Sequence, residues 1–366
     1  MRLRASNWSR AARAMVLATM ATGFGATSGY AQGDTSVTPA PMVTGYGAFT
    51  TTFEPGSQSV NPTVAPILLV PAGRRGLIEA EFEVESDLDR TNGVWGDRTV
   101  EKGIEYLQLD YFVHPMLTVV GGRFLTPFGM YNERLHPAWI RNLMTAPLIF
   151  GLSANSSTGA MVRGGVPIGE DAVLNYATYY SAPYSSTQST LKLLNSERSA
   201  GGRWSVFLNE SRVETGFSYK RQLGNERFDA YGGDFTWNIR STPLDLRAEF
   251  VRSAHGNGYW GEGAYRTVHV PVWSGFFRRS QIVARLEKFY APSDAHVEMD
   301  AQPLDGMAST QTGHAAVPEM DTTRPMVGWN YYFSDGFKFS LGYGRSMTSD
   351  DTHRIWSIGV AYRFGS

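Results

Sequence analysis

The fold is decided by one stretch of sequence, Leu77-Ile-Glu-Ala-Glu-Phe-Glu-Val-Glu85, in which apolar and acidic residues alternate without interruption from Ile78 onward. Successive side chains of a β-strand point to opposite faces, so the pattern predicts a strand with one apolar face and one face of four glutamates. Four ionised carboxylates cannot lie in a dry core without partners. The acidic face must therefore meet water, either outside a soluble sheet or inside a wet pore.

The C-terminus repeats this two-faced pattern over Arg354–Phe364. One face carries Trp356, Ile358, Val360, Tyr362 and Phe364, and the other carries Ser357, Gly359, Ala361 and Arg363. Alternation at both ends of the chain predicts an all-β protein.

Similar segments occupy most of the chain between these two strands, and tight turns join them in pairs. Strands are expected near 43–54, 63–70, 76–86, 103–113, 117–127, 157–166, 172–182, 200–208, 213–221, 229–240, 244–254, 264–275, 281–290, 325–333, 337–347 and 354–364. Longer connections alternate with the turns, at 87–102, 129–156, 184–199, 255–263, 291–324 and 348–353. About 16 strands with short turns on one rim and long loops on the other predict a transmembrane antiparallel β-barrel.

Composition narrows the class further. The chain is 42% hydrophobic, with 39 Gly, 20 Phe, 18 Tyr and 9 Trp, as expected for a barrel whose alternate residues face lipid. The near-balance of 33 basic and 34 acidic residues argues against a nucleic-acid partner. The absence of cysteine excludes disulfide and thiolate chemistry.

The N-terminus has the features of an export signal. A basic start is followed by a short apolar run and by Gly29-Tyr30-Ala31, which predicts a signal peptide over residues 1–31. Its removal takes away four arginines and no acidic residue, which leaves 29 basic and 34 acidic residues. Residues 32–42 are expected to be a flexible leader, and 43–366 the barrel. The predicted location is the cell outer membrane.

A soluble β-sandwich is the alternative to a membrane barrel, because it would also bury one face of each strand. The number of consecutive meander strands and the aromatic residues on the apolar faces weigh against it. Those aromatics are Trp237, Trp329, Tyr331, Tyr343, Trp356 and Tyr362.

The face opposite the apolar one is expected to line a lumen, because a charged side chain facing lipid costs about 2–4 kcal/mol near the bilayer midplane. The expected pore-lining residues are Glu79, Glu81, Glu83, Asp110, Arg123, Arg163, Arg203, Glu214, Asp234, Asn238, Asp245, Arg247, Glu249, Arg285, Glu287, Lys338 and Arg363. Many of these charges could instead bridge adjacent strands and only stabilise the wall.

One connection differs from the others, because residues 129–156 are rich in apolar side chains and proline. Long apolar loops seldom lie on a surface, so this one is expected to fold into the barrel mouth as a constriction loop. Its expected functional residues are Asn132, Glu133, Arg134, His136, Trp139 and Arg141. A packed lid or a contact between subunits is the alternative.

No cofactor, metal site or catalytic residue is expected. The seven histidines show no ligand spacing. Gly256-Asn-Gly-Tyr-Trp-Gly261 matches a dinucleotide-binding pattern but falls in a predicted outer loop without a following helix. The protein is therefore not expected to be an enzyme, although a hydrolase assembled at the rim would leave no motif.

Several short motifs resemble the superfamily of phosphate-selective porins O and P of Gram-negative bacteria. They include Gly76-Leu-Ile-Glu-Ala-Glu-Phe-Glu, Ile104-Glu-Tyr-Leu-Gln-Leu-Asp-Tyr, Gly122-Arg-Phe-Leu-Thr-Pro-Phe-Gly and Gly159-Ala-Met-Val-Arg-Gly. The alternating C-terminal strand also resembles the assembly signal of outer-membrane proteins, although Gly365 and Ser366 follow its Phe. The resemblance implies a 16-stranded, trimeric porin that passes small solutes. It does not extend to phosphate as the solute, because the glutamate face opposes anions.

The sequence thus predicts an outer-membrane porin for passive diffusion of ions and small hydrophilic solutes, with membrane lipid and a homotrimer as partners. A non-conducting binding, adhesin or structural barrel is the second hypothesis, for which 291–324 is the candidate binding loop. Stepwise conductance in a planar bilayer separates the two.

Overall fold

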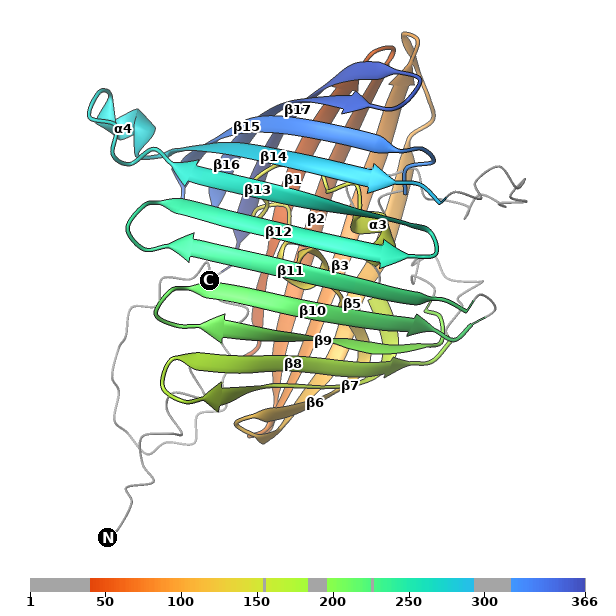
Figure 1. Ribbon diagram of the computed structural model, residues 1–366, viewed down its shortest axis with the longest axis vertical. Coiled ribbons are helices and arrows are strands. Elements are labelled where there is room, and N and C mark those ends of the chain that lie inside the picture. Colours follow the sequence, from red (N-terminus) through yellow and green to blue (C-terminus); the bar gives the residue numbers. More distant parts are fainter. Residues whose placement is uncertain (1–39, 154–155, 184–195, 225–226, 293–316, 366) are drawn as a thin grey trace.

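The strands form one closed barrel (Figure 1). The computed structural model describes residues 40–153, 156–183, 196–224, 227–292 and 317–365. Within them, seventeen strands form a single antiparallel sheet, and β1 (Met42–Glu54) pairs with β17 (Thr352–Phe364) to close it. Because β4 (Val94–Trp95) has only two residues, sixteen long strands make the wall. Closure leaves no exposed sheet edge, and it confirms the predicted fold class.

The long strands run almost from end to end of the described chain. After β1 they are β2 (Ser57–Ala72), β3 (Gly76–Thr91), β5 (Thr99–His114), β6 (Leu117–Leu125), β7 (Ser156–Ile168), β8 (Ala172–Ser181), β9 (Ser199–Leu208), β10 (Val213–Gln222), β11 (Asp229–Ile239), β12 (Leu244–Ser253), β13 (Gly256–Arg266), β14 (Ser280–Tyr290), β15 (Thr322–Ser334) and β16 (Phe337–Met347), followed by β17.

The two rims of the barrel differ. The rim at which β1 begins and β17 ends, the termini rim, carries mostly connections of two to four residues. The opposite rim, the loop rim, carries the connections 126–155, 182–198 and 291–321. Residues 1–31, the predicted signal peptide, and 293–316, most of the predicted binding loop, lie outside the described residues.

One pair of sequence predictions is wrong. The expected loop 255–263 is part of β13, and the expected strand 264–275 is mostly the connection 267–279, which contains the short helix α4 (Ser274–Phe277). β13 has four glycines, which weakens the strand pattern. Val268-His-Val-Pro-Val alternates like a strand, but it lies beyond the rim, where no neighbouring strand is available to pair.

The weak strand expected at 63–70 is longer than predicted. β2 pairs with β1 over Ser57–Leu69, and a two-residue turn at Pro55–Gly56 connects them. Pro62 and Pro66 obscure the strand pattern because proline cannot donate to a ladder. The β2–β3 pairing is interrupted at these two prolines. The β2–β3 ladder therefore requires no N–H donor from either of them.

The outer face of the wall is apolar and partly aromatic. Phe276 of α4 stacks on Trp329 and Tyr331, with ring centroids 5.7 Å and 5.3 Å away. In the described part of the chain, no helix is both long enough and apolar enough to cross a bilayer.

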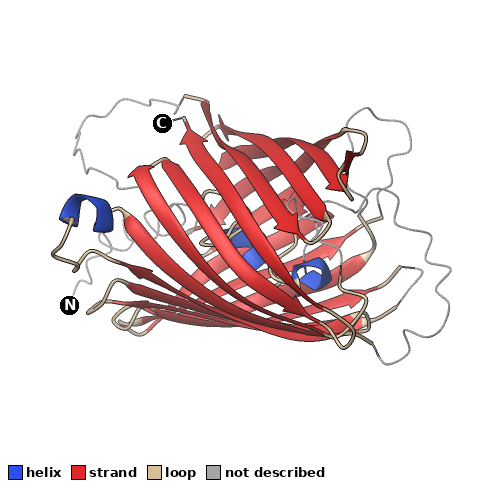
Figure 2. Ribbon diagram, turned by 90° about the horizontal axis from the view of Figure 1, so that it is seen from above, coloured by secondary structure: helices blue, strands red, loops and turns tan. Residues whose placement is uncertain are grey.

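The interior is occupied by the long connection between β6 and β7. It contains two short helices, α2 (Tyr131–Arg134) and α3 (Phe150–Ser153). Figure 2 shows short helices enclosed by the ring of strands, whereas α4 projects from the rim. The expected in-folding of this connection is what the structure shows.

Candidate functional site

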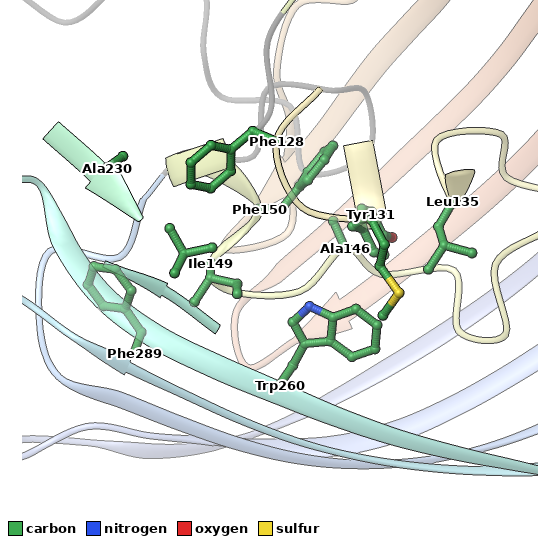
Figure 3. Packing of buried hydrophobic residues seen from close by; sticks show 11 residues of the cluster. Phe128, Tyr131, Leu135, Ala146, Ile149, Phe150, Ala230, Trp260 and Phe289 are labelled. Atoms are coloured by element: carbon green, nitrogen blue, oxygen red, sulfur yellow. The ribbon is translucent and has the colours of Figure 1, made fainter. Parts of the chain in front are cut away.

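Residues 126–155, the inner loop, are held by a buried hydrophobic cluster (Figure 3). Tyr131 packs edge-on against Phe150 of the same loop, at 4.7 Å between ring centroids, and against Trp260 of β13 at 6.0 Å. Phe128 and Ile149 join the cluster from the loop, and Ala230, Val251 and Phe289 join it from the wall. Each large apolar side chain buried in this way contributes about 1.5–3 kcal/mol.

Glycines on the inner wall make room for the inner loop. A Cβ atom at Gly258 would lie 2.7 Å from Cγ2 of Ile149, and one at Gly328 would overlap Cδ2 of Leu143. The wall is therefore shaped to receive these two loop side chains. The fit accounts for one of the four glycines that weaken the strand pattern of β13, Gly258.

Replacing one of these glycines tests the fit. Gly328→Val is expected to destabilise the folded barrel by about 1–3 kcal/mol, because the added carbons overlap Leu143. Urea unfolding in detergent micelles measures the loss, and Leu143→Ala in the same chain should restore most of it. Gly261→Ala is the control, since nothing lies within 4 Å of a Cβ there. Equal losses for Gly328→Val with and without Leu143→Ala would show that the loop does not occupy this space.

Backbone groups of the inner loop are bound by side chains of the wall. Glu249 accepts hydrogen bonds from the N–H groups of Met130 and Tyr131, at 3.2 Å and 3.1 Å. Ser218 accepts a third from Gly129 at 2.9 Å. These contacts satisfy donors that would otherwise be buried without partners.

Glu287 joins the inner loop to two arginines of the wall. Its carboxylate accepts from the Leu148 N–H at 2.7 Å, from Arg285 Nε at 2.7 Å and from Arg324 Nη2 at 2.9 Å. The two arginines also donate to loop carbonyls: Arg285 Nη2 to Thr145 at 2.9 Å and Arg324 Nη2 to Ala146 at 2.6 Å. This network, the Glu287 hub, is fully buried at its centre.

A second charged chain connects α2 with β9, β10 and β11. Arg134 pairs with Glu214 at 2.5 Å, and Glu214 lies 3.2 Å from Arg203, which pairs with Asp234 at 2.5 Å. Beside it, burial raises the pKa of Glu133, and Arg203, Arg163 and Arg134 oppose that rise. Arg163 of β7 pairs with Asp110 of β5.

The inner loop also reaches the glutamate face of β3. His136 Nε2 lies 3.9 Å from Oε1 of Glu81, and both side chains are 2% exposed. Further along the loop, Arg363 lies over the ring of Trp139 at 5.3 Å. Arg141 donates to the carbonyl of Leu135 and Asn132 donates to the carbonyl of Thr126.

The structure brings most of the expected pore residues into these networks. Glu79 accepts from Gln108 at 3.4 Å, Tyr46 donates to Glu83 at 3.1 Å, and Asp245 pairs with Arg247 at 2.6 Å. Arg123 donates Nε to the Ile104 carbonyl at 2.9 Å, and its strand register pairs it with Leu107. Many of these charges therefore stabilise the wall, the alternative that the sequence left open.

Exposure differs strongly among the inner charges. The side chains of Arg134 and Arg163 are each 27% exposed, whereas Glu81, Glu83 and Glu287 are almost fully buried. Water therefore reaches the arginines more readily than the glutamate face.

Several residues of the site were not predicted, among them Arg324 of the Glu287 hub and Ser218. Trp260 and Glu262 fall in the segment mistaken for a loop, and Glu262 accepts from Asn142 of the inner loop at 2.7 Å. Glu105 lies at a bulge between β3 and β5, where two residues oppose one and the alternation changes phase. A two-residue periodicity cannot find an inward side chain at such a bulge.

The chain was compared with known proteins. No family model and no curated protein matches it. Among solved structures, Pseudomonas putida OprB at low pH matches with a TM-score of 0.54 and 9% identity, covering 98% of this chain and 97% of that one. A loop L8 deletion mutant of OmpT, an outer membrane protein of Vibrio cholerae, matches with a TM-score of 0.50 and 11% identity, covering 89% and 100%. At these identities the likeness is one of fold: this chain is similar to OprB and OmpT in its closed antiparallel barrel.

Proposed function

We propose that the protein is an outer-membrane porin that passes ions and small hydrophilic solutes by diffusion. The observation that carries this proposal is the inner loop, which lies inside a closed barrel and leaves charged side chains of its own and of the wall in contact with water. Rings of charge at a narrow point of this kind tune which ions pass. The similarity of the fold to OprB and OmpT supports the proposal.

Planar-bilayer recording of the purified full chain tests the function. Stepwise conductance is the expected result, and a barrel that gives no steps would exclude it. The gel mobility and circular dichroism of the same sample would show whether a silent protein is folded.

The exposed arginines are expected to influence passing ions more than the buried glutamates. Arg134→Gln with Arg163→Gln should shift the reversal potential under a salt gradient toward cations, because it removes two exposed positive charges. Glu79→Gln, Glu81→Gln and Glu83→Gln together should lower the preference for cations, and the shift in reversal potential should be smaller than that of the double arginine variant. A larger shift from the glutamate variant would assign selectivity to β3 instead.

The finer points of identity are also proposals. We propose that residues 1–31 are removed on export and that the barrel assembles as a homotrimer in the outer membrane. We also propose that the chain belongs to the phosphate-selective porin superfamily, which the resemblance of its short motifs supports. N-terminal sequencing tests the cleavage, and light scattering of the detergent-solubilised protein tests the trimer. Phosphate-selective conduction is not part of the proposal.

A non-conducting barrel is the second candidate. The observation in its favour is that the inner loop contacts strands from β10 to β17 and also β3. Silence in the bilayer with a folded protein would favour this candidate.

A further inference from the structure

Three side chains from two separate segments meet inside the barrel: Glu81 and Glu83 of β3, and His136 of the inner loop. One carboxylate oxygen from each glutamate and one imidazole nitrogen lie within 4.8 Å of one another, and all three residues are buried. Two carboxylates and one imidazole make a mixed oxygen and nitrogen donor set. Such a set suits a divalent transition-metal ion.

A second observation points to a ligand at the same place. Glu81 lies beside the hydroxyl groups of Tyr106 and Tyr46, yet its Oε1, which lies 3.9 Å from His136 Nε2, has no hydrogen-bond partner among the described residues. Glu81 is 1% exposed. A buried carboxylate oxygen without a partner is costly, and a bound cation would satisfy it.

The local charge also favours a cation. Glu81, Glu83, Glu85 and Glu105 act on one another electrostatically, and in the described part of the chain Arg141 acts on Glu81 and Arg123 on Glu105. Two arginines against four carboxylates leave an excess of two negative charges if all four are ionised. One divalent ion would balance that excess.

We propose that Glu81, Glu83 and His136 bind one divalent transition-metal ion, with Zn²⁺ as the representative, inside the barrel. Two ligand atoms about 2.0–2.2 Å from one tetrahedral ion lie about 3.4 Å apart. The three donor atoms lie within 4.8 Å of one another, so they must close by at most about 1.4 Å. Rotation of a glutamate side chain supplies such a movement. Water or a fourth protein oxygen completes the coordination.

Neighbouring groups support the proposed ligands. Tyr46 Oη donates to Oε2 of Glu83 at 3.1 Å, which orients that carboxylate as outer-shell partners of metal ligands do. The ion would attach the inner loop to β3, in addition to its attachment to β14 and β15 at the Glu287 hub. The loop would then be fixed to both the early and the late strands of the wall.

Metal binding to the purified, folded full chain tests the proposal, independently of conductance. After treatment with a chelator and dialysis, titration with ZnCl₂ is expected to show one saturable site per chain. X-ray absorption at the zinc edge should show one imidazole among oxygen ligands. His136→Gln and Glu81→Gln are each expected to weaken Zn²⁺ binding at least about tenfold. Loss of an outer-shell partner already weakens metal binding about tenfold or more, and loss of a direct ligand should weaken it further.

A second histidine supplies the matched control. His353 lies 3.0 Å from Asp351 and 3.9 Å from Glu54 at the loop rim, where its ring is accessible to adventitious metal. His353→Gln should leave the saturable site unchanged. Loss of binding in His353→Gln with retention in His136→Gln, no saturable binding of Zn²⁺ by the unaltered chain, or a spectrum without imidazole would each overturn the proposal. The spectrum decides even if a ligand variant fails to fold.

Discussion

Deleting residues 132–148 is expected to raise the single-channel conductance several-fold. The deleted segment is the part of the inner loop that crosses the interior from Glu214 toward Lys338 and β3. The rings of Tyr131 and Phe150, on either side of it, contact one another, so the two ends of the deletion lie near each other, and the hydrophobic cluster loses Leu135 and Ala146 but keeps Tyr131 and Phe150. The wall keeps its strands and its closure. The deletion changes only the inner loop, which lies inside the barrel.

The comparison is made in planar bilayers at matched salt. Trp273→Ser, at the residue before α4 on the outside of the termini rim, is the control for a general effect of substitution, and its conductance should equal that of the unaltered chain. A deletion variant whose conductance is unchanged or smaller would show that the loop is a lid or a contact between subunits. The constriction would then lie elsewhere.

Glu287→Ala is expected to lower the free energy of unfolding by about 3–5 kcal/mol. The substitution leaves Arg285 buried without its nearest carboxylate and removes the acceptor of the Leu148 N–H. Removing one partner from a buried charged network lowers the free energy of unfolding by this amount, because the remaining charge stays buried without a counter-charge. Urea unfolding in detergent, followed by tryptophan fluorescence, measures it.

Two controls separate the hub from a general charge effect. Arg221→Ala breaks a surface pair that is 58% and 38% exposed and should cost less than about 1 kcal/mol. Replacing the whole hub with apolar residues, Arg285→Met, Glu287→Leu and Arg324→Met, should recover much of the loss. A cost for Glu287→Ala as small as that of Arg221→Ala would mean that water reaches the hub.

The sequence predicted the barrel because the alternation of side chains is a local property. The Leu77–Glu85 stretch and the last strand each show which face is apolar without reference to any other segment. β13 was missed because its four glycines weaken the strand pattern, and one of them, Gly258, fits Ile149, a residue more than a hundred positions earlier in the chain. A local pattern cannot record a fit of that kind.

The candidate site was only partly predictable for the same reason. The inner loop was found by its apolar content, but its partners were not. Nothing in the sequence around His136 indicates that it meets Glu81, and nothing near Leu148 points to Glu287. Such contacts depend on how far the loop extends inside the barrel, which is set by the register of strands on the opposite wall.

The inner loop has a consequence for the order of assembly. Its hydrogen-bonding partners on β10 to β16 all follow it in the chain, from 80 residues later for Arg134 and Glu214 to 200 residues later for Ala138 and Lys338. Contacts so distant form slowly, because a long stretch of chain must be ordered first. Until the last strands are present, Phe128, Tyr131 and Phe150 have no wall to pack against, and an unfinished chain exposes them. The C-terminal strands must therefore fold before the inner loop can pack against them. Until then the chain exposes apolar side chains and needs protection from aggregation.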